Sequence, residues 1–224
     1  MDQRNVFGDV IPFPAGRFRP AHPSVLAAAA AGVPSVSVPA PSAVSPLAGV
    51  AHSSPVAAAV LSVEIRRLTL VPSQIPAPVV PKVLNRCVLA AVEAMNRAGG
   101  EVAVAGTPER PVLEAMFEGR GSAEVAVRAA EAVRAAVRRT QRAGEHEFHV
   151  SGGVASGWTA SLPGGARLES GSLGTTASRL REDASTGQIL LADPVASMCR
   201  ESVDTAPAEG PGAQEAWLLR GLKG

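Results

Sequence analysis

The sequence has few of the residues that build large aromatic cores. Aromatic residues make up 3% of its 224 residues and tyrosine is absent, so the 46% hydrophobic share consists largely of Ala and Val. We therefore expect an interior packed with small side chains. The length fits one ordinary domain with an extension.

Cysteine, net charge and long apolar runs are also scarce, and each shortage excludes a class of protein. Cys87 and Cys199 lie far apart and outside any zinc or redox spacing, so both are expected to be free and buried. A net charge of +1 gives no basic field that would favour nucleic acid as a partner. No apolar run reaches the roughly 18 residues of a membrane-spanning helix, and prolines interrupt the one stretch with signal-peptide character. We expect a cytoplasmic protein.

Proline divides the chain into a leader and a domain. Residues 1–55 are rich in Pro, Ala and Ser without helical or strand periodicity, which predicts a disordered leader that tethers or spaces. Residues 56–224 contain the patterned segments and are expected to form the domain. A second proline cluster at 72–81 predicts a loop inside it.

The patterned segments alternate between strand and helix. Two long helices are expected at 82–98 and 122–142, with Gly99-Gly100 ending the first. Short strands are expected at the following positions: 60–70, 101–105, 111–117, 148–155, 158–162, 187–191 and 215–219. The order β-α-β-β-α-β predicts an α+β fold with a ferredoxin-like split βαβ core and additional strands.

Several side chains are assigned to the core or the surface by periodicity. The apolar stripe of the second helix is expected to include Val125, Ala129 and Val133. Trp158 and Trp217 are expected in the core, with a dimer interface as the alternative. His146 and His149 are three residues apart, so on a strand they point to opposite faces and predict an exposed strand start rather than a metal site.

Four motifs occur in an order that is informative as a set. The segment 171–192, GSLGTTASRLREDASTGQILLA, combines a helix with a Gly-Gln-Ile-Leu strand. It is preceded by the Gly99-Gly100 helix stop with its hairpin and by Gly153-Val-Ala-Ser-Gly157, and it is followed by the closing Leu-Lys-Gly224. Over roughly residues 61–224 this set resembles the class III adenylate/guanylate cyclase homology domain.

The resemblance implies a reaction that needs two divalent metals held by two aspartates. Glu64 stands at the position of the first aspartate, where it keeps the charge but adds a methylene. Thr107 stands at the position of the second and supplies no charge. The segment Pro108-Glu-Arg-Pro111 is expected to lengthen this hairpin, and Glu109 replaces the lost carboxylate only if the turn is rebuilt.

Two further family positions fall in the segment 171–192. Thr175 corresponds to the ribose-orienting asparagine and is a substitution, while Arg179 matches the arginine that binds the triphosphate and stabilises the transition state. The alternative for Arg179 is an ordinary helix-surface arginine. A second register, with Gly174 on the family glycine, also leaves no asparagine.

These assignments predict a degenerate cyclase-like signalling module that is non-catalytic and acts as a homodimer or as a heterodimer with a cyclase-type domain. No cofactor is expected in that case. The alternative is a divergent, weakly active adenylate or guanylate cyclase that uses Mg or Mn and a nucleoside triphosphate. A third hypothesis is a purely structural domain without nucleotide affinity.

Overall fold

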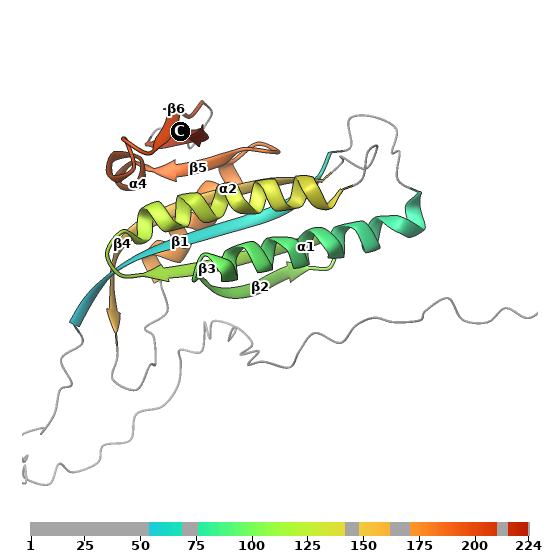
Figure 1. Cartoon of the computed structure of the whole chain (residues 1–224), viewed down its shortest axis with the longest axis horizontal. Coiled ribbons are helices and arrows are strands. Elements are labelled where there is room, and N and C mark those ends of the chain that lie inside the picture. Colours follow the sequence, from blue (N-terminus) through green and yellow to red (C-terminus); the bar gives the residue numbers. More distant parts are fainter. Residues whose placement is uncertain (1–53, 69–75, 142–147, 162–170, 210–214, 224) are drawn as a thin grey trace, which may run out of the picture. The chain divides into compact units, whose positions relative to one another are not determined.

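The computed structural model describes residues 54–68, 76–141, 148–161, 171–209 and 215–223 (Figure 1). All of them belong to one unit of the chain, Ala48–Gly224. The predicted leader, 1–55, lies almost entirely outside the described residues, as do His146 and residues 72–75 of the loop predicted at 72–81. The rest of that loop prediction was wrong, because Ala77–Val79 form a 3-10 turn and a helix begins at Val80.

Seven strands and four α-helices make up the described part of the chain. The strands are β1 Ser54–Arg67, β2 Glu101–Thr107, β3 Arg110–Glu118, β4 Phe148–Ser161, β5 Ile189–Ala192, β6 Val203–Pro207 and β7 Ala216–Leu222. The helices are α1 Val80–Arg97, with the short 3-10 turn Ala77–Val79 before it, α2 Ser122–Thr140, α3 Gly171–Asp183 and α4 Asp193–Met198.

The strands form a single mixed sheet in the order β2-β3-β1-β4-β5-β7-β6. All neighbours are antiparallel except β4 and β5. The first four strands, with α1 and α2 as their connections, have the order of a split βαβ unit. This confirms the predicted α+β fold, with β5, β6 and β7 as the additional strands.

Helices α1 and α2 run side by side over one face of the sheet and enclose the main core (Figure 1). The buried stripe of α1 consists of Val83, Cys87, Ala91 and Met95, which are spaced four apart and fully buried. Gly99 follows in the left-handed conformation with φ 82°, as expected for a helix stop. Cys87 and Cys199 are both free and buried, as predicted.

Helix α3 packs against β4 and β1 on the other face, and glycine permits the close approach. A Cβ atom on Gly153 would lie 2.2 Å from the carbonyl oxygen of Ala177 in α3. The side chains of β1 alternate between these two faces of the sheet. Val63 and Ile65 face the α1–α2 core, while Ser62 and Glu64 face α3.

The first and fourth strands differ from the prediction. Strand β1 begins at Ser54, six residues earlier than expected, because it pairs with β4 along fourteen consecutive positions. The two strands predicted at 148–155 and 158–162 are one continuous strand, since Gly157 packs under Leu173 of α3 instead of forming a turn. Helix α4 and strand β6 were not predicted.

Some of the burial predictions were also wrong. Trp158 is 73% exposed near the end of β4, and Val125 is 37% exposed on α2, whose buried side is centred instead on Ala126, Ala130 and Val133. His149 is half-buried rather than an exposed strand start. The prediction for Trp217 is confirmed in part, because this side chain is half-buried and packs against the main core, and its Nε1 donates a hydrogen bond to Asp193 at 3.0 Å.

Candidate functional site

Glu64 is the centre of a polar cluster on the face of the sheet that α3 covers. The strand alternation of β1 directs this side chain away from the α1–α2 core and toward the end of α3. Only 4% of the residue is exposed to solvent. A carboxylate at this depth requires partners, because an ionised group without them is costly to bury.

Two arginines supply those partners. The Nε of Arg66 donates to Glu64 Oε2 at 3.0 Å, and the Nε of Arg110 donates to Glu64 Oε1 at 2.8 Å. The Arg66 side chain is 20% exposed, whereas that of Arg110 is 74% exposed. Both oxygens of the carboxylate therefore accept hydrogen bonds from guanidinium groups, and of the two guanidinium groups that of Arg66 is largely desolvated.

Arg66 also ties β1 to the end of α3. Its two terminal nitrogens donate to the carbonyl oxygens of Ala184 at 2.6 Å and Arg181 at 2.9 Å. Carbonyl groups at a helix C-terminus lack partners within the helix and carry partial negative charge, so a cation is favourable there. Arg66 thus serves the carboxylate and the helix end at the same time.

A second set of hydrogen bonds lies beside the first and joins α3 to β1 and β3. The carboxylate of Glu114 accepts from Ser178 at 2.8 Å and from Ser62 at 3.3 Å. The buried guanidinium of Arg181 donates to Ser62 at 3.2 Å and to Glu182 at 2.8 Å. The buried side of α3 thus joins polar contacts made by Ser178 and Arg181 to the apolar packing of Ala177 and Leu180, and the Nε of Arg181 is left without a partner in the described structure.

The charges around Glu64 set its protonation. Burial alone would raise the pKa of this carboxyl group, but hydrogen bonds from Arg110 and Arg66 and the charges of both arginines outweigh that effect. The net result is a pKa below the ordinary value. Glu64 is accordingly a carboxylate at neutral pH.

The β2–β3 hairpin places Thr107 at the end of β2, where it is exposed. Its hydroxyl accepts a hydrogen bond from the backbone nitrogen of Arg110 at 3.2 Å. Thr107 and Arg110 are the last paired residues, so only Pro108 and Glu109 form the turn. The expected lengthening of this hairpin is not observed, because proline fits the second position of a tight turn.

Helix α3 carries Thr175 and Arg179 on its exposed side. The structure does not bring either of them into the polar cluster around Glu64; in the described chain the arginine of α3 that reaches the sheet is Arg181. The role predicted for Arg179 stays a prediction.

Sequence reasoning missed three arginines of this cluster. Arg66 was detectable, because it lies two residues after Glu64 on the same strand face. Arg181 was also detectable, since it follows the buried Ala177 by four residues of helix. Arg110 carried no signal beyond its position next to the turn, because its contact depends on the register of β3 against β1.

These residues do not fit a two-metal centre of the kind the resemblance implies. Divalent cations of the Mg²⁺ class need several oxygen ligands with negative charge. Here the guanidinium groups of Arg66 and Arg110 already bond both oxygens of Glu64, and the carboxylate of Glu114 accepts from the hydroxyl groups of Ser178 and Ser62. Within the described ranges no group of three or more His, Cys, Asp or Glu is placed to hold a metal ion.

No helix in the described part of the chain combines the length and the apolar character that a membrane crossing requires.

Comparison with known proteins gives a fold but no sequence family. No protein-family model matches the chain, and a search of curated proteins found no match. Among solved structures, the adenylyl cyclase CyaB from P. aeruginosa is similar with a TM-score of 0.57 and 17% identity over 75% of this chain and 95% of that one.

Guanylyl cyclase domains show the same likeness. The monomeric domain of the RhoGC fusion protein from the aquatic fungus Blastocladiella emersonii has a TM-score of 0.58 and 15% identity, covering 76% of this chain and 99% of that one. A non-canonical dimeric form of that domain has a TM-score of 0.56 and 16% identity, covering 77% and 99%. At such identities the likeness shows the fold alone, which is that of adenylyl and guanylyl cyclase domains.

Proposed function

We propose that this chain is a degenerate, non-catalytic signalling module with a cyclase-like fold. It acts by associating with itself or with a cyclase-type domain. The observation that carries the proposal is the pairing of Glu64 with Arg66 and Arg110. The carboxylate of Glu64 has the charge of a metal ligand, but both of its oxygens already accept hydrogen bonds from guanidinium groups of the same chain. The second ligand position is the neutral Thr107.

Arginine in place of a metal changes the chemistry available. A divalent cation lowers the pKa of an attacking hydroxyl and draws phosphate oxygens together, whereas a guanidinium group offers only hydrogen bonds and a single charge. The arrangement of Glu64 with Arg66 and Arg110 therefore suits a structural role or anion recognition better than activation of a hydroxyl group. We accordingly expect the protein to need neither Mg nor Mn.

The alternative, a weakly active cyclase, requires Glu64 to be released from both arginines and joined by Glu109. The tight turn argues against it, because Glu109 is exposed in the two-residue connection while Arg110 points back to Glu64. Nucleotide contact by Arg179 remains compatible with the proposal if a partner domain supplies the carboxylates. We further propose a cytoplasmic location for such a signalling module.

An activity assay tests the non-catalytic part of the proposal. The purified full chain is incubated with ATP or GTP and Mn²⁺, and cyclic nucleotides are measured by chromatography with mass detection. We expect no product above a blank without protein. Robust product formation that is lost in both Glu64→Gln and Glu109→Gln would support the weak-cyclase alternative instead.

Association is tested through Trp158, whose 73% exposure on β4 offers a large apolar anchor for a partner. Sedimentation equilibrium of the full chain is expected to show a dimer. Trp158→Ser is expected to weaken the dimer about tenfold or more, because truncation of a buried interface anchor costs at least about 1.4 kcal/mol.

Leu89→Ser provides the matched control. Leu89 is 49% exposed on α1, and its replacement by serine is also a change from an exposed apolar side chain to a polar one. It is expected to leave the dimer unchanged. A monomer at all concentrations, or equal effects of the two variants, would contradict the self-association at this residue.

A further inference from the structure

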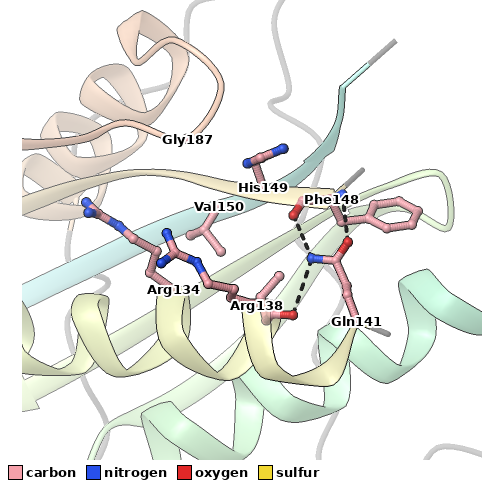
Figure 2. A pocket seen from close by; sticks show the side chains of 8 residues that line it. Arg134, Arg138, Gln141, Phe148, His149, Val150 and Gly187 are labelled. Atoms are coloured by element: carbon pink, nitrogen blue, oxygen red, sulfur yellow. Dashed lines mark hydrogen bonds between the residues drawn. The ribbon is translucent and has the colours of Figure 1, made fainter. Parts of the chain in front are cut away.

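A cavity of about 270 Å³ lies apart from the Glu64 cluster, between the end of α2, the start of β4 and the loop at Gly187. Figure 2 shows the side chains of Arg134 and Arg138 extending from α2 toward β4, with His149 and Gly187 on the other side of that strand. Val137 and Val150 provide an apolar floor, and His149 lines the cavity from β4. The lining thus combines basic side chains with an apolar base.

The two arginines are one helical turn apart and are incompletely neutralised. Arg134 has one terminal nitrogen 3.5 Å from Glu131 Oε1 and donates from the other to the Leu219 carbonyl at 3.3 Å. Within the described chain no hydrogen bond or ion pair engages Arg138. Like charges at this spacing destabilise a helix by about 0.2 to 0.5 kcal/mol, which an anion between them would relieve.

One buried donor on the α2 side of this cavity has no partner in the described structure, the Nε of Arg134. Buried nitrogens without hydrogen bonds are uncommon in native proteins, and an anion held on this side of β4 would relieve the unpaired donor. His149 lies on the other side of β4, where a Cβ on Gly187 would be 3.9 Å from its Nδ1.

The wall of the cavity is fixed without any ligand. The amide of Gln141 donates to the Phe148 carbonyl at 2.8 Å and accepts from the Phe148 backbone nitrogen at 3.0 Å. These two bonds, drawn in Figure 2, join the end of α2 to the start of β4. The cavity is therefore largely pre-organised, which lowers the entropic cost of binding.

We propose that this cavity binds a phosphate group. Guanidinium forks match phosphate oxygens in a bidentate way, and the guanidinium of Arg138, unpaired within the described chain, stands one helical turn from that of Arg134. The volume lies below the roughly 300 to 1,000 Å³ of sites that enclose a drug-sized ligand, so a whole nucleotide is too large to be enclosed. The ligand is either free phosphate or the terminal phosphate of a small phosphomonoester.

Thermal unfolding of the full chain tests the proposal with inorganic phosphate and with glycerol 3-phosphate, each against chloride at equal ionic strength. Both phosphates at about 10 mM are expected to raise the midpoint through preferential binding to the folded state. A larger shift with glycerol 3-phosphate assigns the site to a phosphomonoester, and an equal shift assigns it to free phosphate.

Arg138→Gln and Arg139→Gln form a matched pair of variants. Both residues are exposed neighbours at the end of α2, but Arg139 lines the groove between α1 and α2 instead. Arg138→Gln is expected to weaken phosphate binding about tenfold or more while Arg139→Gln leaves it unchanged. Absence of any shift with either phosphate, or equal weakening by the two variants, would overturn the proposal.

Discussion

Replacing Gly153 by alanine is expected to lower the free energy of unfolding by about 3 kcal/mol, the upper end of ordinary overpacking effects. The added Cβ would meet the Ala177 carbonyl at 2.2 Å and the Leu180 Cβ at 2.5 Å. Neither can yield alone, because the first is backbone and the second begins a buried side chain. The whole of α3 must move away from β4, which also pulls on the Arg66 contacts at its end.

The measurement is urea unfolding followed by circular dichroism. Gly221→Ala is the control, since this glycine of β7 has no atom within 4 Å of a new Cβ and does not adopt a left-handed conformation. It is expected to change stability by no more than about 0.5 kcal/mol. Equal stability of Gly153→Ala and Gly221→Ala would show that α3 does not pack on β4 as described.

Replacing Glu64 by glutamine is expected to cost about 2 to 4 kcal/mol of stability. Loss of one partner from a buried ion pair typically costs about 3 to 5 kcal/mol, and the exposure of Arg110 reduces the value here. The amide nitrogen of glutamine cannot accept a hydrogen bond, so one guanidinium group faces a donor instead of an acceptor. Glu109→Gln, in the exposed turn, is expected to be neutral.

The effect of Glu64→Gln depends on pH with a definite sign. The folded-state pKa of Glu64 lies below its ordinary value of 4.5. Its contribution is therefore fully present above the unfolded pKa and is lost as pH falls through the folded pKa. The stability difference between the wild type and Glu64→Gln should shrink between pH 7 and about pH 3. A constant difference would show that the carboxylate charge is not what stabilises the fold.

The fold was largely predictable because its signals are local. The apolar stripe at Val83, Cys87, Ala91 and Met95 defines α1 by period alone, and Gly99 ends it through a backbone preference. The split of β4 into two strands was wrong because Gly157 reads as a turn signal in sequence. Only the packing of Leu173 over it shows why glycine is needed within a strand.

The site was predictable in its carboxylate but not in its partners. Glu64 was identified from the motif order, whereas its bonds to Arg66 and Arg110 depend on the register of three strands and on the turn at Pro108. The exposure of Trp158 was likewise missed, since hydrophobicity predicts burial without saying where the covering helices end. Long-range register and helix length are tertiary properties that local patterns do not contain.

Guanidinium groups take the place of metal ions at Glu64 in the proposed function, and a Mn²⁺ titration of the full chain is the decisive measurement. Free Mn²⁺ is measured by electron paramagnetic resonance for the wild type, Glu64→Gln and Glu109→Gln. If the arginines occupy the carboxylate, no Mn²⁺ binds to Glu64 with a Kd below about 1 mM, so that all three proteins give the same curve. Binding that is tighter than this in the wild type, lost in Glu64→Gln and retained in Glu109→Gln would contradict it.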